Sequence, residues 1–273
     1  MRIVLLSAAA VALSGCSWLG LGGNSGSYGH DIGTYKASSH HNQGGCSDCQ
    51  LSRWNMEGGV GTEFVTGPNF LRASQANAIA GTTVRSTSME DAFDKGLRYE
   101  LGGSYARNPN QKISVTGYNT QHNGNRVNLG TTAGQAVSGD VSDYDSWGVE
   151  VGLRQYALPI KAPLVKSVRP YVEGRLGAAH VDDIGLSNVT RGNAAGADIA
   201  LYDSTWVPTA AGLIGVETPV FNRFTMGVET GIRYNGKLDS ADTGLSAGQP
   251  FAGLNNGGDK WSVPLTLRGR YRF

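Results

Sequence analysis

The pattern that most constrains this chain is an alternation of apolar and polar side chains that begins at Arg53 and runs to Phe273. Successive side chains of a β-strand point to opposite faces, so a period of two predicts strands with one apolar and one polar face. It is clearest in the last such segment, where Trp261, Val263 and Leu265 begin the apolar face. The eight predicted strands cover residues 53–64, 97–105, 113–122, 147–154, 168–178, 206–217, 224–234 and 261–273.

The connections between these segments alternate in length. Short ones lie around residues 108–110, 159–167 and 219–223, whereas the other four are long and polar. Outer-membrane barrels have an even strand count, short periplasmic turns and long extracellular loops. The pattern therefore predicts an all-β fold, a closed eight-stranded antiparallel transmembrane β-barrel with both termini in the periplasm.

A soluble barrel of the lipocalin kind alternates too, so other features must show which face is outside. Large aromatic residues fall at the ends of the apolar faces, as in the aromatic girdles of membrane barrels. One group is expected near the extracellular ends and the other near the periplasmic ends: Trp147, Trp206 and Trp261, and Trp54, Phe224, Tyr271 and Phe273. We therefore expect the apolar faces to meet lipid.

The polar faces carry seven of the eight Glu and nine of the sixteen Arg, with no Lys in the middle of a face. Arginine is favoured in enclosed ion pairs because its planar fork meets a carboxylate bidentately. An eight-stranded barrel is only wide enough for side chains to fill it. The sequence thus predicts a paired network inside the barrel, formed by Glu57, Arg98, Glu100, Glu150, Arg154, Glu173, Arg175, Glu229, Arg233, Arg268 and Arg270.

The apolar face of the last segment ends with Tyr271 and Phe273, which resembles the C-terminal insertion signal of outer-membrane proteins. From Trp54 to Phe273 the chain resembles the small eight-stranded outer-membrane barrels of the OmpA transmembrane-domain type. The resemblance implies contact with outer-membrane lipid and lipopolysaccharide, and insertion by the barrel-assembly machinery. The chain departs from that type at its N-terminus, where a different signal precedes the barrel.

The N-terminus has the pattern of an export signal, with Arg2 before the short apolar stretch 3–12. The following Leu13-Ser14-Gly15-Cys16 resembles the lipobox of bacterial lipoproteins, in which the cysteine is acylated and becomes the new N-terminus. The alternative is an ordinary secretory signal with a chance cysteine.

We accordingly divide the chain into a lipoprotein signal peptide (1–15), an acylated Cys16 with a flexible periplasmic tether (16–52) and the barrel (53–273). The tether is rich in Gly, Ser and His and shows neither a strand nor a helix period. Its Cys46 and Cys49, which follow His40-His41, are expected to form a disulfide in an oxidising periplasm. A redox pair or a zinc site is the alternative there; we expect no resident metal or cofactor.

The net charge of +1 gives no reason to expect nucleic acid, and no apolar stretch is long enough for a transmembrane helix. The leading hypothesis is a non-enzymatic, lipid-anchored outer-membrane barrel with a structural or interaction role, whose tether contacts a periplasmic partner. One alternative is a narrow channel for small solutes or ions. The other is a lipid-modifying enzyme that uses His122 or His180 at the rim.

Overall fold

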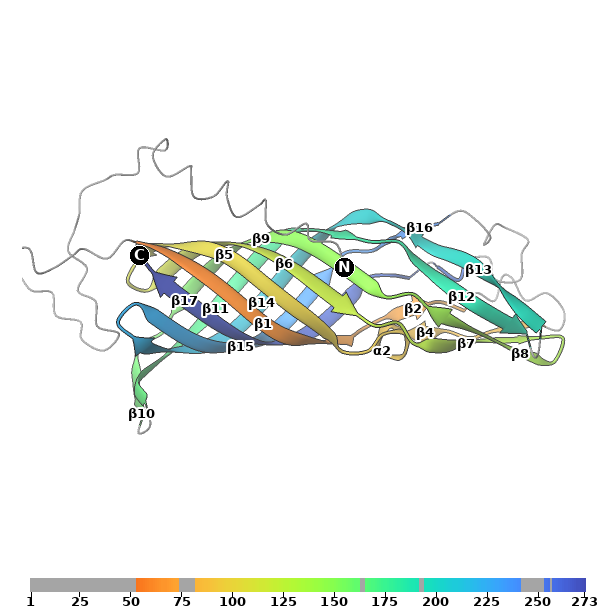
Figure 1. Ribbon diagram of the computed structural model, residues 1–273, viewed down its shortest axis with the longest axis horizontal. Coiled ribbons are helices and arrows are strands. Elements are labelled where there is room, and N and C mark those ends of the chain that lie inside the picture. The colour runs from red at the N-terminus through yellow and green to blue at the C-terminus, as the bar shows by residue number, and fades with distance from the viewer. Residues whose placement is uncertain (1–52, 74–81, 163–164, 192–193, 242–252, 256) are drawn as a thin grey trace, which may run out of the picture.

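The computed structural model describes residues 53–73, 82–162, 165–191, 194–241, 253–255 and 257–273. Eight long antiparallel strands form a barrel (Figure 1). They are β1 (Trp54–Thr66), β5 (Gly96–Asn108), β6 (Gln111–His122), β9 (Tyr144–Tyr156), β11 (Val165–Val181), β14 (Thr205–Phe221), β15 (Phe224–Asn235) and β17 (Lys260–Arg272). Each of the eight predicted segments matches one of these strands, with only Arg53 and Phe273 lying one residue outside β1 and β17.

The barrel is closed. Each barrel strand pairs with the barrel strand that follows it in the sequence, including β9 with β11 and β15 with β17. The last strand, β17, also pairs with the first, β1, which closes the ring. Pairing of the first and last strands runs from Asn55 opposite Arg272 to Thr66 opposite Trp261. Every barrel strand thus has two hydrogen-bonded neighbours and leaves no open edge, which a strand in hydrocarbon requires. The predicted fold class is confirmed.

The two ends of the barrel differ. At the end where β1 begins and β17 ends, here called the termini end, β5 joins β6 and β14 joins β15 through tight turns. The third connection at this end carries the short strand β10 (Ile160–Ala162), which pairs with the start of β11. The predicted tether, the predicted acylation site Cys16, and Cys46 and Cys49 lie outside the described residues.

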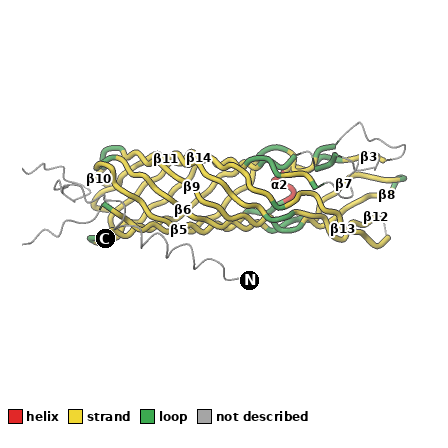
Figure 2. Tube along the Cα trace, turned by 90° about the horizontal axis from the view of Figure 1, so that it is seen from above, coloured by secondary structure: helices red, strands yellow, loops and turns green. Residues whose placement is uncertain are grey.

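At the opposite end, the cap end, the described parts of the four long connections form further strands and a short helix (Figure 2). The six strands of a second sheet continue beyond the barrel: β3 (Thr82–Val84), β7 (Arg126–Thr132), β8 (Gln135–Val141), β12 (Ile184–Arg191), β13 (Ala194–Asp203) and β16 (Asp239–Ser240). The first connection also holds β2 (Asn69–Leu71), β4 (Thr87–Ser88) and the one-turn helix α2 (Met89–Ala92). The Ser88 hydroxyl accepts a hydrogen bond from the Asp91 amide and so caps this helix.

No helix among the described residues is long and apolar enough to cross a membrane.

Candidate functional site: a charged interior beneath an apolar cap

The strand alternation turns the charged side chains inward. All eleven side chains of the predicted network lie inside the barrel, and none is more than 5% exposed. Their neighbours along the strands point outward; Val151, for example, is 54% exposed and Leu176 70% exposed. Exposed apolar side chains that alternate with buried charged ones are the inverse of the pattern in a soluble protein.

Glu100 is surrounded by four guanidinium groups near the middle of the interior. Its carboxylate accepts hydrogen bonds from Arg98 at 2.8 Å, Arg175 at 3.1 Å and Arg233 at 2.9 Å, and also from Arg268. These donors come from four different strands, so one carboxylate ties opposite walls of the barrel together.

Arg175 is the matching cation. Its guanidinium forms ion pairs with Glu100, Glu173 and Glu229 at 3.0–3.1 Å. Because ions buried away from water are costly unless they are paired and hydrogen-bonded, such multiple contacts are what a charged interior requires. Tyr171 adds a hydroxyl donor to Glu229 at 3.0 Å.

A second part of the network lies nearer the termini end. Arg154 forms ion pairs with Glu57 at 2.9 Å and with Glu173 at 2.8 Å. Arg270 pairs with Glu217 at 2.8 Å and also donates to the Tyr156 hydroxyl. The pairs overlap through shared partners and form a continuous column of charge.

Two lysines belong to this interior, and the sequence did not indicate them. Lys112 and Lys260 lie near opposite ends of the barrel and are both buried. By contrast Arg53, Arg169 and Arg272, which share the polar faces, are only half-buried at the termini end. The buried interior therefore holds seven Glu against six Arg and two Lys, and its charges nearly balance.

At the cap end of the column Lys260 joins the charged interior to the apolar cap. Its ammonium lies 3.1 Å from Glu63, 3.2 Å from His122 Nε2 and 4.2 Å from the centre of the Tyr144 ring. Ser262 donates a hydrogen bond to the same Glu63 oxygen at 2.7 Å. The other nitrogen of His122 lies 2.9 Å from the backbone oxygen of Asp94. The second carboxylate oxygen of Glu63 accepts no hydrogen bond from the described residues, and the guanidinium of Arg98 lies 3.7 Å from it.

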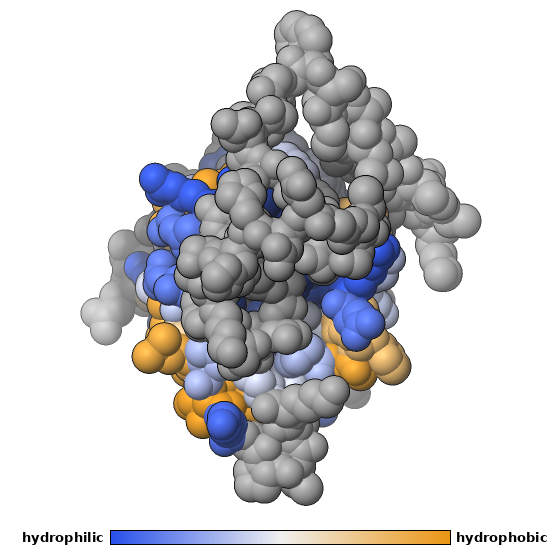
Figure 3. All heavy atoms as spheres, turned by 90° about the vertical axis from the view of Figure 1, so that its left-hand side faces the viewer, coloured by the Kyte–Doolittle hydropathy of each residue, from blue (hydrophilic) through white to orange (hydrophobic). Residues whose placement is uncertain are grey.

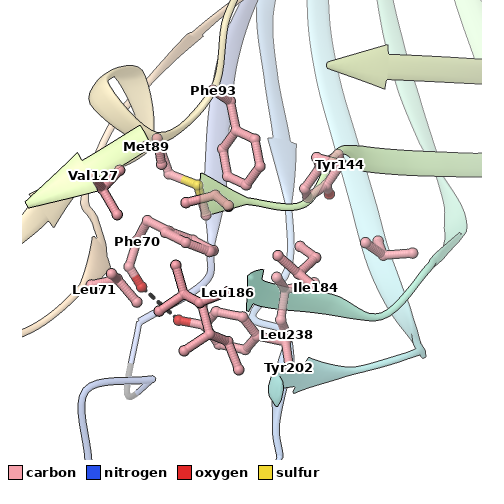
Figure 4. Close-up of a cluster of buried hydrophobic side chains, with 14 of the residues drawn as sticks. Phe70, Leu71, Met89, Phe93, Val127, Tyr144, Ile184, Leu186, Tyr202 and Leu238 are labelled. Carbon is pink, nitrogen blue, oxygen red and sulfur yellow. Dashed lines mark hydrogen bonds between the residues drawn. The ribbon is translucent and has the colours of Figure 1, made fainter. Parts of the chain in front are cut away.

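The described parts of the four long connections (67–95, 123–143, 182–204 and 236–259) form the cap, and they share one hydrophobic core. Phe70 packs against Phe93 and Tyr202 with ring centres 5.0 and 5.4 Å apart, and Phe93 packs against Tyr144 of the barrel at 5.7 Å (Figure 4). The Tyr202 hydroxyl donates to the Phe70 carbonyl oxygen at 2.6 Å. Burial raises the pKa of the Tyr202 phenol further above neutral pH.

Each connection contributes to this core, which also includes the last inward-facing layer of the barrel. Its buried members from the connections are Phe70, Leu71, Met89, Ala92, Phe93, Val127, Leu129, Val137, Val141, Ile184, Leu186, Leu201, Tyr202, Leu238 and Leu254. The prediction of four long polar loops was therefore wrong in this respect. The cap covers the mouth of the barrel directly above Lys260 and His122.

The two histidines considered for catalysis lie in different surroundings. His122 is buried beneath the cap. His180 is on the outer wall, stacked on Trp147 at 5.6 Å and edge-on to Trp206 at 5.5 Å, with Asp182 3.4 Å away. The structure thus does not bring them together. Among the described residues there is also no group of three His, Cys, Asp or Glu that could hold a metal ion.

The outer wall is an apolar belt bounded by aromatic residues. Trp147 and Trp206 meet edge-to-face at 5.1 Å at its cap end, whereas Trp54 meets Tyr105 at 5.0 Å at its termini end. Between these two levels the outward positions of the described strands carry no Asp, Glu, Lys or Arg. A closed barrel with an apolar belt between two aromatic girdles has the features of a barrel that spans a lipid bilayer. The fold is that of a small outer-membrane β-barrel.

No protein-family model and no curated protein matches the chain. Among solved structures it is similar to Neisserial surface protein A (13% identity, TM-score 0.45), with 82% of this chain and 99% of that one covered. It is also similar to the N-terminal barrel domain of Pseudomonas aeruginosa OprF (9%, TM-score 0.33, 81% and 100% covered). A third is Yersinia pestis Ail, solved with the heparin analogue sucrose octasulfate (15%, TM-score 0.34, 81% and 99% covered). At these low scores the fold assignment rests on the geometry described above.

Proposed function

We propose that this protein is a lipid-anchored outer-membrane barrel with a structural or interaction role, and that its interior is closed to solutes. The observation that carries the proposal is the filled interior. Seven carboxylates and eight basic groups occupy an eight-stranded barrel, and the apolar core of the cap covers its mouth. An ion that crossed the barrel would have to displace side chains of both the charged interior and the apolar core of the cap.

Single-channel recording in planar bilayers tests closure. We expect no reproducible openings from the purified, full-length protein. The double variant Arg175→Ala/Arg268→Ala, which removes two large side chains from the middle of the column, serves as the comparison and is expected to raise the leak. Reproducible openings of the unmodified protein would favour the alternative function, a narrow channel for small solutes or ions.

The anchor and the tether belong to the proposal as well. Acylation of Cys16 would hold the chain in the leaflet beside the termini end, because Asn55 pairs with Arg272 there and the chain enters the barrel at that point. We place this end in the periplasm, as the short turns suggest. The tether, residues 16–52, is then free to contact a periplasmic partner, and Cys46 and Cys49 form its disulfide.

On the other side the cap is presented outside the cell, where lipopolysaccharide surrounds the cap-end aromatic residues. Insertion of the barrel is assigned to the barrel-assembly machinery, through the signal at Tyr271 and Phe273. The proposal includes no catalytic role. His122 has no access to substrate beneath the cap, and the partner of the lipid-facing His180 is Asp182.

A further inference from the structure

Charge is distributed unequally between the two ends of the molecule. The three turn segments at the termini end, 106–111, 157–169 and 218–223, contain five basic residues and no acidic one. The four long connections at the cap end contain twelve acidic and six basic residues. Since the interior nearly balances itself, this asymmetry lies on the parts of the protein that face its surroundings.

Three of the basic side chains at the termini end are exposed: Arg107, Lys161 and Arg223. We call them the basic rim. Arg107 lies near the end of β5, two residues after Tyr105 of the aromatic girdle, and its side chain is exposed. Lys161 is the middle residue of β10, which projects sideways from the barrel wall, and Arg223 lies in the turn between β14 and β15 (Figure 1). The rim thus lies where the apolar belt ends.

Exposed apolar side chains lie next to these charges in the same turns. Leu158 is 74% and Phe221 72% exposed, the highest values for large apolar residues in the described part of the chain. Ile160 adjoins Lys161 and is also exposed. Figure 3 looks onto this end and shows hydrophobic and hydrophilic residues side by side around the edge.

Apolar and basic side chains side by side at the edge of a membrane-spanning surface fit one kind of surroundings. The apolar side chains enter the acyl region, while the long basic side chains extend toward the headgroups. Basic side chains near an anionic leaflet are attracted to its headgroups. We infer that the basic rim binds the phosphate groups of anionic phospholipids in the leaflet at the termini end. This inference rests on the membrane-spanning fold and not on the proposed anchor or interaction role.

The test uses the full-length protein in nanodiscs of phosphatidylcholine alone or of phosphatidylcholine mixed with phosphatidylglycerol. Lipids that remain bound after mild release are identified by native mass spectrometry. We expect phosphatidylglycerol to be enriched on the unmodified protein. The variant Arg107→Gln/Lys161→Gln/Arg223→Gln should lower the enrichment by roughly a hundredfold, because each basic residue near an anionic leaflet contributes a factor of about five. Raising the salt concentration should weaken the enrichment on the unmodified protein.

The matched control is Arg72→Gln/Arg85→Gln/Lys95→Gln, which removes three exposed bases from the cap. It should keep the enrichment. Equal enrichment in the rim variant and the unmodified protein would overturn the inference, as would equal loss in both variants, which would show a response to total charge alone. Conductance or a missing anchor would contradict the proposed function without altering this result, so the two failures are distinguishable.

Discussion

Glu100 is the side chain on which the largest number of interior cations depend. Its replacement by alanine would leave Arg98, Arg175, Arg233 and Arg268 with one carboxylate fewer inside the barrel. Removing one partner of a buried ion pair costs roughly 3–5 kcal/mol, because the remaining charge stays desolvated. We therefore expect Glu100→Ala to lower the free energy of unfolding by about that amount, measured by urea titration of the barrel in lipid vesicles.

The control for this substitution is Asp183→Ala, which removes an exposed carboxylate from the cap. Exposed substitutions away from special features usually change stability by no more than about 0.5 kcal/mol. Similar losses at the two positions would show that the interior pairs contribute nothing particular. A Glu100→Ala protein as stable as the original would have the same meaning.

For single residues, the alternation of apolar and polar side chains shows which face a residue occupies in the middle of a strand. It does not show this at the ends of a strand. The alternation around Glu150 and Arg154 assigns both side chains to the polar face without ambiguity. Lys112 and Lys260 lie at the second and first positions of their strands, where few neighbours define a period. Only the register of β6 and β17 against the neighbouring strands shows that both lysines point inward.

At the scale of elements, the cap should unfold separately from the barrel. Phe93 is buried between Phe70 and Tyr144 and contributes little to the barrel wall. Truncation of a buried phenylalanine to alanine typically costs about 3–5 kcal/mol. We expect Phe93→Ala to increase amide hydrogen exchange in β7 and β12 severalfold, while the barrel strands keep their protection.

Phe221→Ala provides the control, since it removes the same ring from an exposed position at the opposite end. It should leave exchange in the cap unchanged. If Phe93→Ala exposed the barrel strands equally, the cap and barrel would form one cooperative unit, and the description of the cap as a separate layer would fail.

The sequence contains a signal for the cap strands that the prediction of polar loops did not use. Val127 and Leu129, like Ile184 and Leu186, are spaced two residues apart, the same signal that identified the barrel strands. These strands are short, and Gly, Ser and Asn interrupt their apolar faces. Their pairing with one another, β8 with β12 for instance, depends on contacts between connections far apart in the sequence. Local pattern alone could not supply that arrangement.

At the scale of the whole molecule, closure followed from the even strand count and the alternating connections, because hydrocarbon permits no unpaired edge. What the sequence could not give was how the connections at each end pack together. The acidic cap and the basic rim each assemble from several connections that the barrel brings together. The excess of acidic residues at one end and of basic residues at the other can be counted segment by segment. Only the folded chain shows which of these side chains are exposed.

The last strand allows the role of the C-terminal residues in assembly to be separated from their role in the folded barrel. Phe273 is 47% exposed, ends the apolar face that β17 presents, and meets Tyr271 edge-to-face at 5.7 Å. It makes no contact with the interior network, so Phe273→Ser should change the stability of the refolded barrel little. If the terminal residues are an insertion signal, the same substitution should lower the amount of barrel in the outer membrane severalfold.

Phe64→Ser is the matched control, because Phe64 is 45% exposed on the same apolar belt, near the cap end of β1. The measurement is the heat-dependent shift in gel mobility of the outer-membrane fraction, since a closed barrel resists detergent until it is heated. We expect the shifted species to be scarce for Phe273→Ser and abundant for Phe64→Ser. If both variants lowered the amount of barrel equally, the cause would be the loss of apolar surface. If neither variant lowered it, Tyr271 and Phe273 would not act as an insertion signal.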